Sequence, residues 1–237
     1  MIHDFNTSKN IAGEHNSDLA SSAARLIKSN TFRELHTVWV TPTVNHRLDD
    51  QVVFQSWMSV SFPPNQRTSR LCVANAEVGQ AYDTAVEVIL NDTNTNWKYM
   101  LTVESDNLPP GNGLMKLLES VDKYDVVGGL YWMKGEGGHA HIYGHPSKPG
   151  TWAPQVPHED TVQPCNMTAM GFTLFNMDIF RKMPKPWFKS SDSTDSDQYT
   201  QDGYFFQKAH KLGLNLRVAV DTRIKVGHID FNTRHIW

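Results

Sequence analysis

The sequence has few cysteines, no excess of basic residues and no long apolar run. Cys72 and Cys165 are too few for a disulfide scaffold or a thiolate zinc site, and their scarcity is consistent with a reducing compartment. We expect both thiols to be buried or nearly buried. The 22 basic residues are outnumbered by 25 acidic ones, which gives a formal net charge of -3 and no global positive field. Sequence-independent nucleic-acid binding is therefore not expected as the main function.

Segments that would send the chain to or across a membrane are also lacking. No run of about 18 apolar residues occurs, so we expect no membrane span. The first thirty residues do not show a basic head followed by an apolar stretch, the pattern of a secretory signal. We therefore predict a cytoplasmic location. A G-x-x-x-x-G-K-S/T motif is also absent, which excludes phosphoryl transfer through a P-loop.

What is present is an alternation of strand-like and helix-like segments. Strands are predicted at residues 38–40, 70–75, 99–103, 125–132, 167–175, 216–220 and 223–226, and helices at residues 48–61, 79–91, 114–121, 178–183 and 201–212. Residues 134–163 are rich in glycine, histidine and proline and predict an extended loop. The alternation favours an α/β fold whose open, mostly parallel sheet has helices on both faces.

An acidic pair follows the predicted strand at residues 99–103. Glu104 and Asp106 flank Ser105 directly before a Pro-Pro pair. Ligands of open α/β sheets bind at the carboxyl ends of the strands, so Asp106 could coordinate a hard divalent cation while Glu104 meets a ribose or base. The alternative is that both carboxylates cap a helix or form a turn.

Two further polar residues stand at the ends of predicted elements. Asp202, after Gln201, begins a helix and could remove a proton from an attacking hydroxyl, although a carboxylate there also suits the helix macrodipole. His228 follows the last strand in the tripeptide VGH and could complete a metal site begun upstream, or be a surface histidine.

These three features, in this order, resemble the glycosyltransferases of the GT-A fold, and family 2 in particular, over residues 38–229. The family's acidic D-x-D element is matched by Glu104, Ser105 and Asp106, with glutamate in the first position. In the family, the end of one strand opens the nucleotide site, and the end of the first predicted strand here matches it. The family also has a helix that starts with an acidic pair, and the segment QDGYFFQKAHKLG matches this helix, with Gln201 in place of the first acid.

The resemblance implies a role for each matched residue. The nucleotide-sugar contacts would be Thr41, Pro42, Thr43, Asp83, Glu104 and Ser105. Asp106 and His228 would hold Mn²⁺ or Mg²⁺, and Asp202 would act as the general base of an inverting enzyme. Met170 and Gly171 would belong to the acceptor segment, and Trp152 to a loop over the donor sugar.

The resemblance also implies a domain plan and partners. Residues 1–35 would form a polar, partly helical extension with a helix at 19–28, and residues 36–237 one catalytic domain with a donor half at 36–133 and an acceptor half at 134–237. The partners would be a nucleotide-diphosphate sugar, with UDP favoured, and an unidentified hydroxyl acceptor. We expect a small hexosyltransferase, such as one encoded by a phage, which would then act in the host cytoplasm, or by a capsule locus.

Two other functions are compatible with the residues. A metal-dependent hydrolase could use the histidines of the loop, which are His139, His141, His145 and His158, because an H-x-H pair with a third histidine nearby can bind zinc. A GT-A-like module that binds without catalysis is the non-enzymatic alternative. It would be expected to lose its carboxylates first, whereas Glu104, Asp106 and Asp202 are all acidic.

Overall fold

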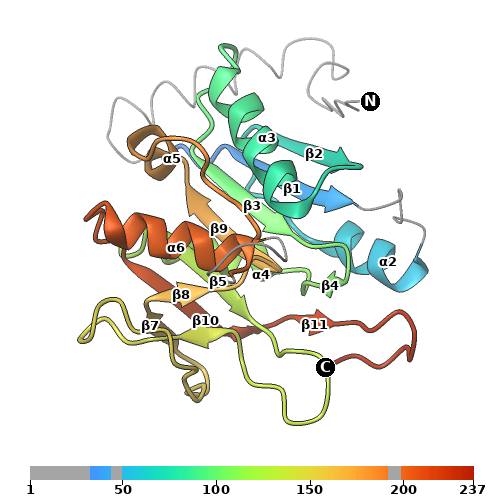
Figure 1. The fold of residues 1–237 in the computed structure, drawn as a ribbon. Coiled ribbons are helices and arrows are strands. Elements are labelled where there is room, and N and C mark those ends of the chain that lie inside the picture. Colours follow the sequence, from blue (N-terminus) through green and yellow to red (C-terminus); the bar gives the residue numbers. More distant parts are fainter. Residues whose placement is uncertain (1–32, 44–49, 192–198) are drawn as a thin grey trace.

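A computed structural model of the chain describes residues 33–43, 50–191 and 199–237. The predicted helix at 19–28 lies outside the described residues. A seven-stranded sheet, in the order β2-β1-β3-β9-β5-β10-β7, runs through the molecule (Figure 1). It contains strands from both predicted halves of the chain, and the division into halves itself remains a prediction.

The strands of this sheet are β1 (Thr37–Thr43), β2 (Thr68–Ala74), β3 (Tyr99–Val103), β5 (Val126–Leu130), β7 (Val162–Cys165), β9 (Phe172–Asn176) and β10 (Val218–Lys225). The helices are α2 (Gln51–Ser59), α3 (Val78–Asn91), α4 (Gly113–Leu118), α5 (Asp178–Lys182) and α6 (Gln201–Lys211). Two small two-stranded sheets pair β4 (Asn107–Leu108) with β11 (Gly227–His228), and β6 (Ile142–Tyr143) with β8 (Met167–Thr168).

The main sheet is mostly parallel, as the alternation predicts. β1 pairs in parallel with β2 and β3, and β10 pairs in parallel with β5. β9 runs antiparallel between β3 and β5, and β7 runs antiparallel to β10 at the edge. Five of the seven strands therefore point the same way, and their carboxyl ends lie along one edge of the sheet.

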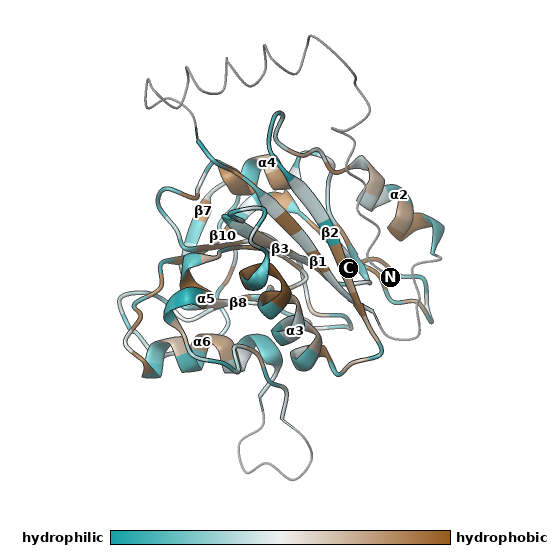
Figure 2. Ribbon diagram, turned by 90° about the horizontal axis from the view of Figure 1, so that it is seen from above, coloured by the Kyte–Doolittle hydropathy of each residue, from teal (hydrophilic) through white to brown (hydrophobic). Residues whose placement is uncertain are grey.

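Helices cover both faces of the sheet. In Figure 2, α3, α5 and α6 lie on one side of it, and α2 and α4 on the other. Alternate residues of β1 point to opposite faces, since Val38 and Val40 belong to the core under α3, α5 and α6, and Trp39 to the core under α2 and α4. The predicted α/β class with two covered faces is confirmed.

The first strand is longer than predicted. We expected Pro42 to stop it, but β1 continues to Thr43 and pairs with β2 as far as Thr43 and Ala74. On its other side β1 pairs with β3 only up to Val40. Pro42 is tolerated because it lies beyond the two-sided part of the strand, where a missing N–H removes no hydrogen bond to β3.

The carboxyl-terminal third also differs from the sequence-based expectation. Residues 167–175 form two strands, because β8 pairs with β6 and β9 with the main sheet. The two strands predicted at 216–220 and 223–226 are replaced by a single strand, β10, at Val218–Lys225. Its polar Asp221 is buried but satisfied, since the carboxylate accepts hydrogen bonds from Arg223, and the strand continues with a shift in register. The predicted loop at 134–163 contains β6 and the start of β7.

The two cysteines differ in exposure. Cys165 is buried, as predicted, but Cys72 is exposed on β2, which is the edge strand of the sheet and has only one neighbour. Within the three described ranges, no helix is both long and apolar enough to cross a bilayer.

Candidate active site

The acidic pair lies in a turn at the carboxyl end of β3. The turn is closed by a hydrogen bond from the amide of Asn107 to the carbonyl of Glu104 (3.0 Å), and the amide of Glu104 donates to the carbonyl of Gly171 (3.1 Å). A Cβ at Gly171 would lie 2.5 Å from Oδ1 of Asn107 and 2.6 Å from the ring of Tyr131. Only glycine fits there, so this residue lets the chain before β9 approach the acidic turn.

His228 reaches the same turn through the small sheet of β4 and β11. It pairs with Asn107 across that sheet, and the next amide, that of Ile229, donates to the carbonyl of Asp106 (2.9 Å). Its Nδ1 lies 2.8 Å from the carbonyl oxygen of Trp132, which can only accept, so Nδ1 carries a proton. Its Nε2 faces Oδ2 of Asp106 at 3.4 Å, so this nitrogen donates to the carboxylate when the ring is protonated and offers a lone pair when the ring is neutral.

Lys134 provides a positive charge at the same place. Its ammonium donates to Oδ2 of Asp106, the oxygen that faces His228. Burial opposes ionisation of Asp106, but the hydrogen bonds from His228 and Lys134 outweigh it and lower the pKa of this carboxyl to about 2. Asp106 is therefore an ionised carboxylate at neutral pH.

Glu104 carries the opposite shift. Burial, followed by the negative charges of Asp106 and Asp202, raises the pKa of Glu104 to about 8, against a hydrogen bond from the Gln201 amide (3.2 Å) that lowers it. The neighbouring carboxyl groups thus differ in protonation, with Glu104 neutral and Asp106 charged near pH 7. Since these groups interact, the proton belongs to the cluster as a whole.

Asp202 is the second residue of α6 and lies beside this cluster. Thr200 is the N-cap of the helix, and Oδ1 of Asp202 accepts hydrogen bonds from the Thr200 hydroxyl and from the amide of Gly203 (2.9 Å). Burial raises the pKa of Asp202, and these hydrogen bonds oppose the shift. The side chain that sequence reasoning proposes as a base is therefore fixed in orientation and more basic than an exposed aspartate.

The predicted nucleotide contacts at the end of β1 lie at the same edge of the sheet. β1 pairs in parallel with β3 up to Val40 and Thr102, so the carboxyl ends of the two strands, with Pro42 and Glu104 just beyond, lie at the same edge. Thr41 is buried, and its hydroxyl accepts a hydrogen bond from the indole of Trp39 (2.8 Å).

Two of the predicted contact residues have structural roles. Met170 is buried in the core, and its carbonyl accepts a hydrogen bond from Thr102 (2.7 Å), so its side chain is not available to an acceptor. Asp83, expected near a nucleobase, instead accepts hydrogen bonds from the amides of Trp187 (2.7 Å) and Phe188 (2.8 Å) and ties that segment to α3.

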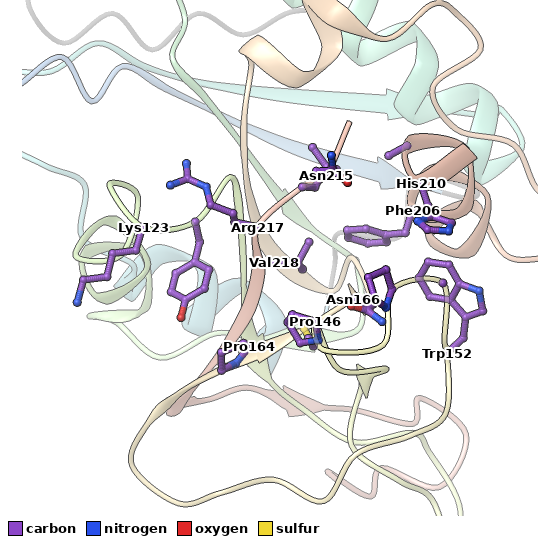
Figure 3. A pocket seen from close by; sticks show the side chains of 16 residues that line it. Lys123, Pro146, Trp152, Pro164, Asn166, Phe206, His210, Asn215, Arg217 and Val218 are labelled. Carbon is purple, nitrogen blue, oxygen red and sulfur yellow. The ribbon is translucent and has the colours of Figure 1, made fainter. Parts of the chain in front are cut away.

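Trp152 lies away from the acidic turn. It packs edge-to-face against His210 (6.3 Å between ring centroids), nine residues beyond Gln201 on α6, which is about 13 Å along a helix. Both rings line a cavity of about 460 Å³ near the start of β10, at the edge of the sheet opposite Glu104 (Figure 3). The loop from β6 folds over the far end of α6, and a contact of Trp152 with a donor sugar stays a prediction.

The histidine-rich loop does not converge on a metal. His139 and His141 flank the hydroxyl of Tyr143, at 3.2 and 2.9 Å, while His145 bonds to Ser147 (2.8 Å). In the part of the chain that the structure describes, no three His, Cys, Asp or Glu side chains are grouped so as to hold a metal ion. Within the described residues, the structure therefore provides no group of ligands on which the hydrolase alternative could be built.

Sequence reasoning missed other residues of the site. Tyr131 packs against the rings of His141 (4.5 Å) and His228 (5.5 Å), and its hydroxyl accepts a hydrogen bond from the amide of Gly171 (2.7 Å). Burial lowers the pKa of His141 to about 3, so this ring is neutral. Lys134 and Tyr131 stand in a glycine-rich segment without a recognisable motif. Their position near the end of a predicted strand is the one feature of the sequence that could have pointed to them as site residues.

The donor set at the turn fits a divalent cation that takes its other ligands from substrate and water. The carboxylate oxygen of Asp106 and the lone pair that His228 offers as a neutral ring are 3.4 Å apart, so one cation can bind both. Carboxylate oxygens suit Mg²⁺ and Mn²⁺, and a neutral imidazole is a common metal ligand. The ammonium of Lys134 now bonds that oxygen and would have to move for a metal ion to bind there.

Comparisons with known proteins bear on the fold. No protein-family model matches the sequence, and no curated protein matches it either. Among solved structures, the chain is similar to the protein A197 from STIV, with a TM-score of 0.57 and 18% identity over 85% of this chain and 92% of the other. It is also similar to S. aureus TarS residues 1–349 in complex with UDP-GlcNAc, with a TM-score of 0.44 and 14% identity over 80% of this chain and 58% of that one. At these identities the likeness to A197 shows a shared fold.

Proposed function

We propose that the chain is a metal-dependent glycosyltransferase with a GT-A fold that moves a hexose from a nucleotide-diphosphate donor to an acceptor hydroxyl. The observation that carries this proposal is the convergence of Glu104, Asp106, Asp202 and His228. These side chains come from three distant segments and meet at the carboxyl edge of the parallel strands, where open α/β sheets bind ligands. UDP is the donor nucleotide we favour, and the cytoplasm is the location we propose.

The donor would lie between the end of β1 and the acidic turn. Thr41 to Thr43 would contact the nucleoside, with Glu104 and Ser105 on its other side. Asp106 and His228 would hold Mn²⁺ or Mg²⁺, which when bound neutralises charge on the leaving diphosphate. The neutral carboxyl of Glu104 can donate a hydrogen bond to the nucleotide, which an ionised carboxylate cannot do.

Asp202 would act on the acceptor. Its carboxylate takes the proton of the acceptor hydroxyl while that oxygen forms a bond to the anomeric carbon of the sugar. The bond from this carbon to the diphosphate oxygen breaks, and its electron pair leaves with the nucleotide diphosphate. An attack of this kind, directed by a base held in the protein, inverts the anomeric centre.

Nucleotide binding is the first test. The thermal midpoint of the full chain should rise with one of UDP, GDP, CDP and dTDP in the presence of Mn²⁺, because a ligand that binds only the native state stabilises it. Asp106→Ala should reduce the metal-dependent part of this stabilisation at least tenfold in apparent affinity, measured by calorimetry. Stabilisation by none of the nucleotides would contradict the proposal.

Transfer is the second test. Asp202→Asn should bind the nucleotide as the unchanged protein does but release nucleotide diphosphate from donor at least 100-fold more slowly, the usual order for loss of a general base. Asp178→Asn is the matched control, because Asp178 also lies in the first turn of a helix, α5, at the opposite edge of the sheet. Unchanged turnover in Asp202→Asn would exclude this base, and binding without turnover in the unchanged protein would favour the non-catalytic module.

A further inference from the structure

Lys134 lies in a tight hairpin beyond the carboxyl end of β5. Trp132 and Ala140 form a bridge that closes the hairpin, and the amide of Met133 donates to the carbonyl of His139 (3.0 Å). At its tip Gly135 has a φ of 104°, a conformation open to glycine and strained for other residues. The backbone of Lys134 is therefore held in place, and its long side chain extends from the hairpin to Asp106.

The side chain of Lys134 is part of the acidic cluster. Its ammonium bonds Oδ2 of Asp106, and its charge also acts on Glu104. The side chains of Lys134 and Asp106 are 29% and 26% exposed, so the pair is only partly screened by water and can be reached by a ligand. A cation of the protein thus already occupies the carboxylate oxygen that a divalent ion would need.

We propose that the ammonium of Lys134 acts as a cation in the donor site. It bonds Asp106 in the free protein and moves to the diphosphate of the donor when the nucleotide binds. This proposal rests on the proposed function. Lysine is suited to the exchange because its ammonium is a compact charge on a flexible stem and binds phosphate oxygens well. The move frees Oδ2 of Asp106 for the divalent ion and adds a second positive charge beside the leaving group.

Two opposite effects of removing the charge follow. Without the ammonium, the competition for Oδ2 of Asp106 ends, so Mn²⁺ alone should bind more tightly. Without the ammonium, the diphosphate also loses a partner that needs no metal, so UDP should bind more weakly in the presence of EDTA. A lysine with a merely structural role would not move these two affinities in opposite directions.

The test compares the full chain with Lys134→Met, which keeps an apolar stem, and with Lys134→Arg, which keeps the charge. Mn²⁺ binding is measured from the electron paramagnetic resonance signal of free Mn²⁺, and UDP binding in EDTA by calorimetry. We expect Lys134→Met to bind Mn²⁺ at least tenfold more tightly and UDP at least tenfold more weakly, and Lys134→Arg to bind UDP within threefold of the unchanged protein. Lys185→Met is the matched control, because Lys185 pairs with Glu87 on the surface (2.8 Å).

The outcomes separate this inference from the proposed function. Equal UDP affinities in EDTA for the unchanged protein and Lys134→Met would overturn the inference. If both proteins still bind UDP with Mn²⁺ in that case, the proposed function stands without it. Equal Mn²⁺ affinities would overturn the placement of the ammonium on Asp106. If UDP binds neither protein with or without Mn²⁺, the proposed function fails and the inference with it. A circular dichroism spectrum of each variant establishes that it is folded.

Discussion

At the residue scale, the site depends on how three carboxyl groups share charge. Asp106 stays ionised because Lys134 and His228 bond it, whereas Glu104 is buried near the negative charges of Asp106 and Asp202 and holds a proton. The family pattern would have an acid in place of Gln201, whose amide now donates to Glu104. A carboxyl group at position 201 would add negative charge to a cluster in which one carboxyl group is already protonated. The neutral amide of Gln201 avoids this repulsion.

Glu104 should make stability depend on pH. Its pKa rises from an ordinary 4.5 to about 8, so between these values the folded chain binds more protons than the unfolded one. The free energy of unfolding should therefore fall as pH rises from about 4.5 to 8. Glu104→Gln removes this titration, and urea unfolding at several pH values should give a flatter profile for the variant.

The control for this prediction is Glu87→Gln, which removes an exposed glutamate from a surface ion pair. Its pH profile should keep the slope of the unchanged protein. An equally steep fall of stability in Glu104→Gln and in the unchanged protein would show that another group is responsible.

At the element scale, short strands decide the geometry of the site. β4 and β11 are two residues each, yet their pairing brings His228 to Asp106, and the break between β8 and β9 brings Gly171 against the acidic turn. Strands of this length carry no readable alternation, and their pairing depends on partners more than a hundred residues apart. Sequence reasoning could select His228 and Gly171 but could not supply the contacts that hold them.

Gly171 provides the test at this scale. Gly171→Ala would press its new methyl group on the buried Asn107 and on Tyr131, and we expect a loss of about 1–3 kcal/mol in the free energy of unfolding. Gly203→Ala is the control, because the nearest contact of a Cβ there is the side chain of Thr200 at 3.3 Å, which a shift of a few tenths of an ångström relieves, and alanine favours a helix. Equal stability of Gly171→Ala and the unchanged protein, measured by urea unfolding, would contradict this close approach.

At the scale of the whole molecule, the two predicted halves are joined within one sheet. β9, from the acceptor half, lies between β3 and β5 of the donor half, and it hydrogen-bonds to both. Removing it would expose the edges of both strands and the buried Phe172 and Phe175. The donor half therefore lacks a complete sheet of its own.

We accordingly predict that residues 36–133 do not fold as an isolated fragment. Their circular dichroism spectrum should be that of an unfolded chain, while residues 36–237 should unfold in a single transition by calorimetry. A folded, cooperative fragment 36–133 would show that the two halves are independent domains.

The sequence by itself determined the local elements and the class of fold. Apolar periodicity located all five described helices and most strands of the main sheet. The reason is that a helix with one buried face has apolar residues three or four positions apart, and a strand with one buried face has them two positions apart. It also marked the ends of elements where polar residues stand, which is how Glu104, Asp106, Asp202 and His228 were found.

Only the tertiary structure decided which of these residues meet. It placed Lys134 on Asp106, tied Asp83 to Trp187 and Phe188, and moved Trp152 to the far end of α6. It also inserted β9 antiparallel between two parallel strands. These arrangements depend on contacts between distant segments, whose free energies come from the packing of the whole core and are not encoded in any local pattern.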